Sequence, residues 1–376
     1  MLLAGAANLK AFGNAINATQ PFFLLCQELN VMVYNELRKD YLLNRWVIIA
    51  TERSRRPSDF AKQKNKSEQN SVCPLCVGNE HMTPPAVMLY LKQNGEVKTD
   101  RDHNGTRSQN WLVRVIPNLY PAFAPPKDPA DQTQIMKNES FGCAVGHHEV
   151  LVESPNHDEA PADAELPQLT ILINAYIDRF RELSAKPYVQ YVSIFRNYGK
   201  DAGASLSHAH SQMIATPIVP RIPAEEMAAS KKFYDQHTKC VFCDIIEKET
   251  KGPRMVLDNQ HFVVFAPYAS VHPLEFWILP KKHASTMLGL SKVEIEAFAE
   301  TLKTSLKALK TLVNDPPYNY CFHLSINRDA ENYYHWHLEV YPRLSIWAGF
   351  EKNTGMYINT VKPETSAAEL RKTIQA

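Results

Sequence analysis

The sequence has almost no excess of charge of either sign. Its 376 residues include 41 lysines and arginines against 40 acidic residues, a formal net charge of +1. A nearly neutral chain has no global field that would attract nucleic acid or an anionic membrane. We therefore expect neither a nucleic acid polymer nor a membrane as partner, and any anionic ligand must be bound by a local cluster of side chains.

Long apolar runs are also missing. A helix that crosses a bilayer needs roughly 18 or more consecutive apolar residues, and the chain contains no such run. The first thirty or so residues are apolar and poor in acidic groups, but Asn8, Asn14 and Asn17 interrupt them, which gives a targeting peptide little support. We expect a soluble, cytoplasmic protein in which residues 1–34 form a peripheral N-terminal extension.

Cysteine is scarce, with seven in the chain, yet four of the seven form two Cys-x-x-Cys pairs. Each pair is followed by a lone histidine and then by a His-x-His-x-(Gln/Glu) cluster. His157 precedes His208 by 51 positions, and His283 precedes His335 by 52. A repeat shows as self-similar spacing before it shows as identity, so the chain is predicted to consist of two related halves.

Two thiolates and two imidazoles are the ligand set of a closed tetrahedral zinc site. A redox dithiol or a disulfide is the alternative, but redox motifs seldom occur twice with a histidine at a matched distance. We therefore predict two structural Zn²⁺ ions per chain. The remaining cysteines, Cys26, Cys143 and Cys321, are predicted to be buried free thiols. The predicted ligands are Cys73, Cys76, His157 and His208 at the first site and Cys240, Cys243, His283 and His335 at the second.

The predicted fold class is α+β, with one long helix over a mainly antiparallel sheet in each half. Apolar residues recur at helical spacing between Glu165 and Leu183 and again from about Lys292 to Val313. The halves are predicted at residues 35–215 and 240–376, joined by a proline-rich and charged linker at 216–239. Short apolar and β-branched runs predict strands at Trp46–Ala50, Asn110–Ile116, His148–Glu153, Tyr188–Phe195, Phe262–Phe265, Phe276–Leu279 and Tyr320–Ile326.

His210 is the candidate nucleophile. A His-x-His pair on a strand projects both imidazoles to one face, so a zinc-bound His208 would hold His210 in a preset position, with Gln212 on the same face. A neutral imidazole that is hydrogen-bonded through one nitrogen presents the other as a nucleophile suited to phosphorus. The alternative is that His210 is a further structural histidine beside the zinc site.

Phosphate-binding groups surround this cluster in the sequence. The segment Asn197–Ser205 contains two glycines that permit close backbone approach, and Asn197, Lys200 and Ser205 offer hydrogen-bond donors. The Gln212 amide could stabilise charge on a non-bridging oxygen. The arginines of the segment 53–56 form either a solvated charge run or a phosphate clamp.

Together these motifs resemble those of the galactose-1-phosphate uridylyltransferases, a family of the histidine-triad superfamily. The resemblance runs from about Asn35 to Pro363. It implies two tandem histidine-triad-like halves, a homodimer, and a ping-pong reaction through a covalent nucleotidyl-His210. The matching segments are Trp46–Pro57, Cys73–Glu80, Asn118–Pro121, Glu153–His157 and Ser207–Gln212.

Site residues follow from this resemblance. His210 and Gln212 become the catalytic residues, and the two Cys/Cys/His/His sets become zinc ligands. UDP-glucose is the implied donor and galactose 1-phosphate the implied acceptor. The residues that match positions holding the nucleotide or its phosphates are Arg53, Arg56, Asn118, Asn197, Ser205 and Gln212.

One departure leaves alternatives open. The bacterial-type enzyme holds its second metal with a glutamate and three histidines, whereas the Cys240 set is similar to the plant ADP-glucose phosphorylase branch of the family. That branch implies ADP-glucose as donor and inorganic phosphate as acceptor. A non-catalytic nucleotide-binding protein is the third possibility, and the intact His-x-His-x-Gln motif argues against it. In the second half, Glu339 replaces Gln212 and would repel phosphate, so that half is expected to be catalytically silent.

Overall fold

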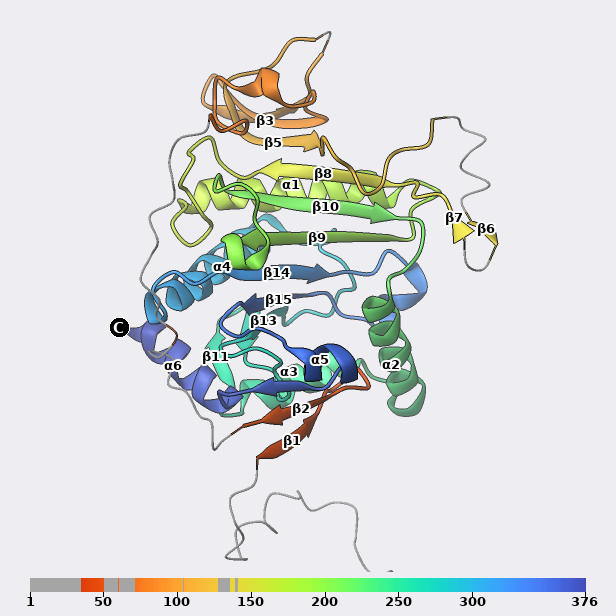
Figure 1. The fold of residues 1–376 in the computed structure, drawn as a ribbon, viewed down its shortest axis with the longest axis vertical. Coiled ribbons are helices and arrows are strands. Elements are labelled where there is room, and N and C mark those ends of the chain that lie inside the picture. Colours follow the sequence, from red (N-terminus) through yellow and green to blue (C-terminus); the bar gives the residue numbers. More distant parts are fainter. Residues whose placement is uncertain (1–34, 51–59, 61–71, 104, 128–135, 139–140) are drawn as a thin grey trace, which may run out of the picture. The chain divides into compact units, whose positions relative to one another are not determined.

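One eleven-stranded sheet, antiparallel throughout, organises the computed structural model (Figure 1). The structure describes residues 35–50, 60, 72–103, 105–127, 136–138 and 141–376. The strands lie in the order β11 (Met255–Asp258), β12 (Phe262–Phe265), β13 (Phe276–Pro280), β15 (His337–Pro342), β14 (Tyr318–His323), β9 (Tyr191–Tyr198), β10 (His210–Thr216), β8 (His147–Val152), β5 (Trp111–Pro117), β3 (Met88–Gln93) and β4 (Glu96–Asp100).

The two repeats meet at the centre of this sheet. Strands β9, β10, β8, β5 and β3 run outward on one side, and β14, β15, β13, β12 and β11 run outward on the other. The central strands β9 and β14 pair with each other, so that Phe195 lies opposite Cys321. Helix α1 (Leu166–Ser184) precedes β9 just as α4 (Lys292–Leu312) precedes β14. The predicted α+β class with two related halves is confirmed.

Helices α1 and α4 cover one face of the sheet and form the main core with it. Apolar side chains of alternate strand positions point toward the two helices, including Ile194, Met213, Phe322 and Leu338. These positions alternate with those of the opposite face. His210 and Gln212 therefore lie on the face that α1 and α4 do not cover.

Over the strands of the second half, α2 (Arg221–His237) and α3 (Val241–Thr250) lie on that opposite face. Phe242 and Ile245 of α3 pack against Phe265 and Trp277. Most of the predicted linker is thus helical. Pro220 and Pro223 stand at the start of α2, where a proline loses no helical hydrogen bond.

The remaining elements lie outside the eleven-stranded sheet. A three-stranded sheet contains β1 (Glu36–Lys39), β2 (Trp46–Ile49) and β16 (Tyr357–Asn359), with β16 parallel to β2. No helix in the described ranges is long and apolar enough to span a membrane. The other elements are β6 (Met136–Asn138), β7 (Phe141–Gly142), α5 (Gly349–Thr354), α6 (Pro363–Gln375) and the 3₁₀ turns η3 (Glu80–Met82), η5 (Lys200–Ala202) and η6 (Arg328–Asn332).

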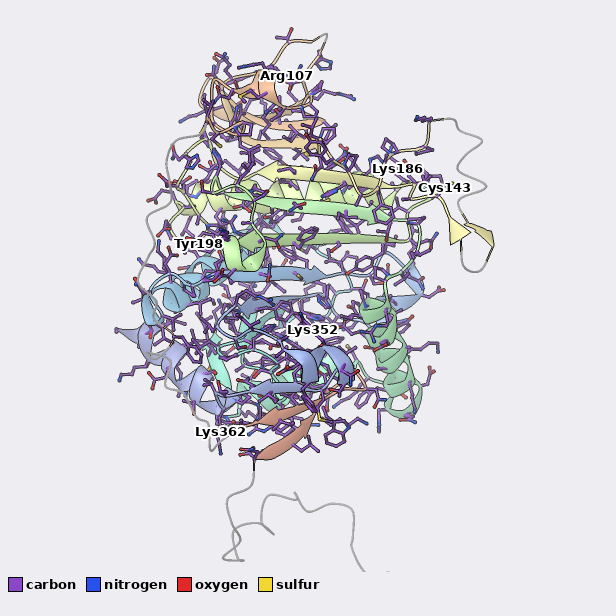
Figure 2. All side chains as sticks on the ribbon, in the orientation of Figure 1. Arg107, Cys143, Lys186, Tyr198, Lys352 and Lys362 are labelled. Carbon is purple, nitrogen blue, oxygen red and sulfur yellow. The ribbon has the colours of Figure 1, made fainter. Side chains whose placement is uncertain are left out.

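The prediction of buried free thiols was wrong for Cys143, which is exposed near β7 (Figure 2). It follows the two-stranded β6–β7 hairpin, away from the main core. Cys321 is only half-buried. It lies on a central strand, but on the face that α1 and α4 do not cover. Cys26 lies outside the described residues.

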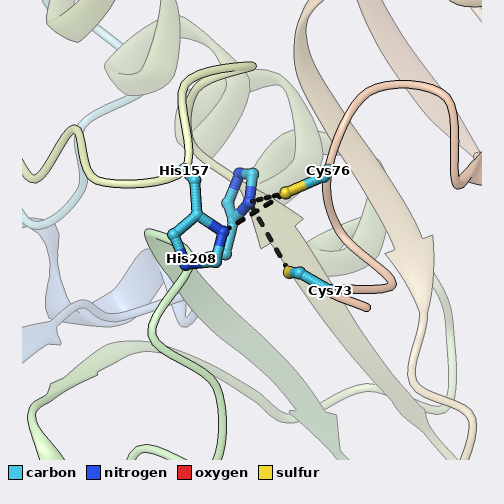
Figure 3. A group of neighbouring side chains, drawn as sticks. All are labelled: Cys73, Cys76, His157 and His208. Carbon is cyan, nitrogen blue, oxygen red and sulfur yellow. Dashed lines mark hydrogen bonds between the residues drawn. The ribbon is translucent and has the colours of Figure 1, made fainter. Parts of the chain in front are cut away.

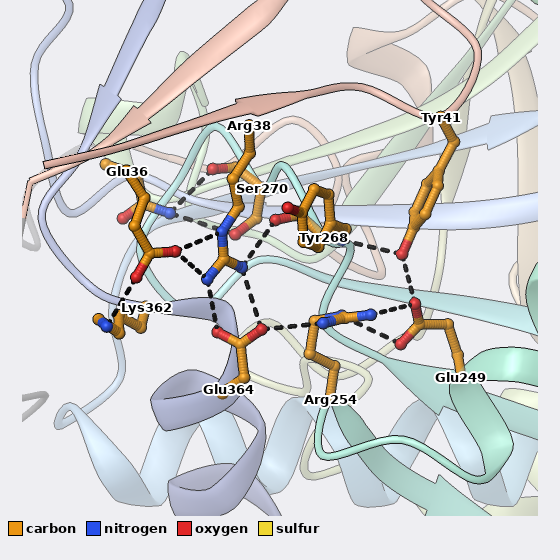
Figure 4. Close-up of polar contacts among 10 residues, drawn as sticks. Glu36, Arg38, Tyr41, Glu249, Arg254, Tyr268, Ser270, Lys362 and Glu364 are labelled. Atoms are coloured by element: carbon orange, nitrogen blue, oxygen red, sulfur yellow. Dashed lines mark hydrogen bonds and ion pairs between the residues drawn. The ribbon is translucent and has the colours of Figure 1, made fainter. Parts of the chain in front are cut away.

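A chain of ion pairs fastens β1 to α3 and α6 (Figure 4). Arg38 of β1, whose side chain is 3% exposed, contacts Glu36 at 2.6 Å and Glu364 of α6 at 3.0 Å. Arg254 joins Glu364 at 2.9 Å to Glu249 of α3 at 2.6 Å. Burial alone would raise the pKa of Glu364, but hydrogen bonds from the two arginines outweigh it and lower that pKa. The network therefore stabilises the carboxylate form.

Replacing Arg38 with methionine should lower the free energy of unfolding by about 3 kcal/mol, because it removes the buried cation that Glu36 and Glu364 share and leaves each carboxylate with one cationic partner. Denaturation in urea measures this change. Lys362→Met is the matched control, because Lys362 contacts the same Glu36 at 2.7 Å but is 44% exposed. Its loss should cost less than about 1 kcal/mol. Equal losses of unfolding free energy in the two variants would show that the burial of Arg38 does not make its ion pairs more stabilising than that of Lys362.

Candidate active site and metal centres

The first predicted metal-ligand set comes together in the structure (Figure 3). Cys73 and Cys76 lie on the turn that leads to η3, His157 lies on the loop after β8, and His208 lies two residues before β10. Cys76 Sγ is 3.2 Å from His157 Nδ1 and 3.5 Å from His208 Nδ1, and Cys73 Sγ is 3.8 Å from His208 Nδ1. The four ligand atoms lie within 4.8 Å of one another.

The second set is arranged in the same way. Cys240 caps the start of α3, Cys243 lies in its first turn, His283 follows β13, and His335 lies two residues before β15. Cys243 Sγ is 3.4 Å from His283 Nδ1 and 3.7 Å from His335 Nδ1. These four ligand atoms also lie within 4.8 Å of one another. Both halves therefore build a Cys/Cys/His/His group between one helix or turn and two strand ends.

All four histidines of these groups turn Nδ1 toward the thiols and Nε2 toward an oxygen. Three of these oxygens are carbonyls, which can only accept, so they fix the proton on Nε2 of those three rings and leave Nδ1 free to bind a metal. The fourth is the Ser207 hydroxyl, which can accept from Nε2 of His157 in the same way. The oxygen partners are Ser154 O for His208 at 2.9 Å, Pro280 O for His335 at 2.8 Å, Glu331 O for His283 at 2.6 Å and Ser207 Oγ for His157 at 2.9 Å.

This geometry fits zinc. Zinc bonds of about 2.3 Å to sulfur and about 2.0 Å to nitrogen at a tetrahedral angle place sulfur and nitrogen about 3.5 Å apart. The separations from Cys76 to His157 and His208 are 3.2 and 3.5 Å, and those from Cys243 to His283 and His335 are 3.4 and 3.7 Å. Four protein ligands complete the coordination of zinc, so each group suits a structural ion.

His210 begins β10 and is 7% exposed. Its Nδ1 lies 2.8 Å from the carbonyl oxygen of His208, which must accept the proton on Nδ1. The lone pair of Nε2 is therefore unprotonated. Burial lowers the pKa of His210, the hydrogen bond to His208 opposes this change, and the charge of Arg196 adds to the lowering. The neutral, nucleophilic form is thus favoured at neutral pH.

Gln212 lies two residues further along β10 on the same face, and it is half-buried. Its Oε1 is 2.7 Å from Nε2 of His148, a residue of the neighbouring strand β8. Asn118 follows β5 and lies beside the same imidazole, with its Nδ2 3.1 Å from His148 Nε2. The structure therefore brings Asn118 and Gln212 together around a histidine that the sequence had not marked as a site residue.

Asn197 lies near the end of β9, which neighbours β10 on its other side. Asn319 of β14 donates from Nδ2 to Asn197 Oδ1 at 2.8 Å, which orients the amide of Asn197. The following turn approaches closely at Gly203, where φ is +89° and a Cβ would lie 3.8 Å from Asn197 Nδ2. Glycine is needed at this left-handed position.

The other predicted phosphate ligands are less enclosed. Ser205 is exposed in the loop between η5 and β10, and Lys200 is exposed in η5. Arg53, Arg55 and Arg56 lie outside the described residues. The described part of the site thus comprises the imidazoles of His210 and His148 and three amide side chains, on or directly after neighbouring strands.

Comparison with known proteins identifies the family. A model of the galactose-1-phosphate uridyl transferase N-terminal domain matches residues 25–220. A domain of unknown function matches residues 156–376. ADP-glucose phosphorylase from Arabidopsis thaliana is 36% identical over 346 residues, which cover 90% of this chain and 92% of that protein. Galactose-1-phosphate uridylyltransferase from Thermotoga maritima is 32% identical, covering 90% and 98%.

This chain belongs to the galactose-1-phosphate uridylyltransferase family. The resemblance seen in the sequence motifs is confirmed, as is the prediction of an enzyme of the nucleotidyltransferase class. A solved ADP-glucose phosphorylase from Arabidopsis thaliana with bound ADP-glucose is similar with a TM-score of 0.74 and 34% identity, covering 90% of this chain and 99% of that one. A solved uridylyltransferase is similar with a TM-score of 0.67 and 27% identity, covering 90% and 98%.

The second half of this uridylyltransferase-family protein holds a third close group, formed by Glu226, His323, His337 and Glu339. All four are buried. His323 lies between two carboxylates, with Nδ1 2.8 Å from Glu226 and Nε2 3.6 Å from Glu339. Burial opposes charge on both partners, yet their mutual attraction raises the pKa of His323 and lowers that of Glu226. The sequence motifs missed Glu226 because helix α2 brings it there from the predicted linker.

In this family member, His337 occupies the position in the second half that His210 occupies in the first. Its Nδ1 likewise contacts a carbonyl, that of His335, at 3.1 Å. Its surroundings differ, because Trp277 stacks on the ring at 5.3 Å and Phe242 lies at 4.8 Å. The side chain is 0% exposed. The aromatic cover agrees with the expectation that this half is catalytically silent, which stays a prediction.

Proposed function

We propose that this protein transfers a nucleotidyl group from a nucleotide sugar to a phosphate acceptor through a covalent intermediate on His210. The observation that supports this most directly is the hydrogen bond from His210 Nδ1 to the His208 carbonyl. It fixes the tautomer whose Nε2 can attack phosphorus. The amide of Gln212 lies two residues along the same strand and that of Asn197 lies on the neighbouring strand β9, where both can donate to phosphate oxygens.

The proposed reaction has two displacements. Nε2 of His210 forms a bond to the α-phosphorus, the bond from that phosphorus to the bridging oxygen breaks, and hexose 1-phosphate leaves with the electron pair. An oxygen of the acceptor then attacks the same phosphorus and releases His210 unchanged. Donors preset toward the non-bridging oxygens stabilise the charge that develops in each transition state.

Zinc is proposed as a structural ion at both Cys/Cys/His/His groups. When bound to His208, it anchors the backbone whose carbonyl oxygen holds His210. The chain's own part in catalysis is then orientation, because the His208 carbonyl fixes the proton of His210 and the buried strand fixes its direction. The homodimer implied by the family resemblance stays a prediction.

We propose ADP-glucose as donor and inorganic phosphate as acceptor. The sequence motifs alone placed UDP-glucose and galactose 1-phosphate first. Similarity to ADP-glucose phosphorylase over 90% of this chain, at 36% identity, favours the adenylyl reaction. The second candidate is uridylyl transfer from UDP-glucose, favoured by the 32% identity to the Thermotoga maritima uridylyltransferase over a similar length.

Mixing the purified protein with ADP-glucose or UDP-glucose, without acceptor, should separate these candidates. Intact mass is measured after rapid denaturation that preserves acid-labile phosphoramidates. We expect one AMP-sized adduct per chain with ADP-glucose and little with UDP-glucose, because His210 is the one proposed nucleophile and ADP-glucose is the proposed donor. A UMP-sized adduct instead would support the uridylyl reaction. No adduct with either donor, in zinc-loaded protein, would refute the covalent mechanism for these substrates.

A further inference from the structure

His148 lies beside Gln212 because of the register of two neighbouring strands. Gln212 of β10 is opposite Val150 of β8, and Ile214 is opposite His148. Residues opposite each other point to the same face, and diagonal neighbours two positions apart remain within reach of long side chains. The imidazole of His148 therefore leans along the uncovered face toward the amide of Gln212.

The proton of His148 is located by a backbone contact. The N–H of Ala122 donates to His148 Nδ1 at 3.1 Å. A nitrogen that accepts a hydrogen bond carries no proton, so the proton of the neutral ring lies on Nε2. Nε2 then donates to Gln212 Oε1 at 2.7 Å. Nδ2 of Asn118 lies 3.1 Å from the same nitrogen. Because Nδ2 is also a donor, it cannot hydrogen-bond to Nε2 in the tautomer that carries its proton there.

This contact decides which way the Gln212 amide faces. An amide side chain has an acceptor end and a donor end that are nearly identical in shape. With Oε1 held by His148, the NH₂ group must face away from His148. If the amide were reversed, its NH₂ group would face the N–H of His148, so that two donors would meet. Its oxygen would then face the anionic phosphate.

We propose that His148 is a positioning residue that fixes the amide of Gln212 so that its N–H groups face the phosphate of the nucleotide sugar. The inference rests on the proposed function, because it assigns a direction to the donor that stabilises the transferring phosphorus. Ala122 controls the tautomer of His148, His148 controls the orientation of Gln212, and Gln212 contacts the substrate.

The second half, which is predicted to be catalytically silent, lacks this arrangement. Glu339 of β15 lies opposite Trp277 of β13, as Gln212 lies opposite Val150, so the counterpart of His148 is Glu275. The carboxylate of Glu275 accepts backbone N–H groups of its own loop, from Val271 at 2.7 Å and from His272 at 3.0 Å. The imidazole that orients the amide is therefore specific to the half that carries the candidate nucleophile.

A double-mutant cycle tests the proposal, with the rate of adduct formation from ADP-glucose as readout. His148→Ala should slow this step by about 10-fold to 100-fold, the scale of a misplaced catalytic contact. The concentration of ADP-glucose that half-saturates the protein should change by less than about threefold. In a Gln212→Ala background the same substitution should change the rate by less than about twofold, because its target is gone. His148→Gln, whose amide nitrogen reaches the place of Nε2, should recover most of the loss.

His147→Ala is the matched control, because the adjacent imidazole contacts Tyr188 at 2.9 Å and not Gln212. It should leave the rate within about twofold. An equal loss from His148→Ala with and without Gln212 would overturn the proposal, as would full activity of His148→Ala or no recovery in His148→Gln. Absence of any adduct in the unsubstituted protein would instead refute the proposed function, and the role of His148 with it.

Discussion

His210→Gly should abolish nucleotidyl transfer while the protein stays folded. The substitution removes the nitrogen that forms the covalent bond, and loss of a nucleophile typically lowers turnover on the order of 10⁴-fold or more. The fold should persist, because the ring of His210 lies on the face opposite the main core of α1 and α4. Turnover with ADP-glucose and phosphate, together with intact mass, measures the change.

The control for this result is the equivalent histidine of the second half. His337→Gln should leave one adduct per chain, because its ring is enclosed by Trp277 and Phe242. Thermal stability should fall instead, because the substitution disturbs a fully buried ring. Substantial transfer by folded His210→Gly, or an adduct lost in folded His337→Gln, would contradict the assignment of the nucleophile.

Cys73→Ala should remove one of two zinc ions per chain and destabilise the first half. Structural zinc contributes about 10–16 kcal/mol to the folding of small zinc domains, so we expect a loss of about 5 kcal/mol or more here. Adduct formation should fall as well, since His208 loses its anchor and its carbonyl oxygen holds His210 Nδ1 at 2.8 Å. Metal content by elemental analysis and thermal unfolding measure both effects.

Cys240→Ala is the comparison, because it breaks the equivalent group in the other half. Zinc should again fall by one per chain and stability should decrease. Adduct formation should survive better than in Cys73→Ala, because the Cys240 group holds His335 and not His208. Unaltered zinc content in both variants would rule out the assigned ligands, and a zinc-free wild-type protein with oxidised Cys-x-x-Cys pairs would support the disulfide alternative.

Local sequence patterns predicted the elements well because each depends on near neighbours. Apolar spacing predicted the helices found at α1 and α4, and the strands at β5, β8 and β12 follow from apolar and β-branched runs. Matched spacing of cysteine and histidine predicted both metal-ligand groups, because a duplicated chain must keep the same ligands at the same distances. Helices, strands and groups of candidate metal ligands can thus be predicted from the spacing of apolar residues and of cysteine and histidine.

Long-range pairing was not readable in this way. Nothing in the pattern of β9 or β14 shows that they pair with each other and join the halves into one sheet. The role of His148 was also missed: it was placed at the start of a strand, but its neighbour Gln212 depends on the register with β10. Glu226 was missed for a similar reason, because tertiary packing sets where α2 lies.

The pairing of β9 with β14 has a consequence for how the enzyme responds to dilution. Two separate polypeptides would form such a central pair only above a threshold concentration, whereas two segments of one chain meet at a high effective concentration. The strand that carries Asn197 is buttressed by Asn319 of the other half at 2.8 Å. Each molecule therefore brings its own supporting half, always in a one-to-one ratio, and this part of the active face survives at any dilution at which the chain stays folded.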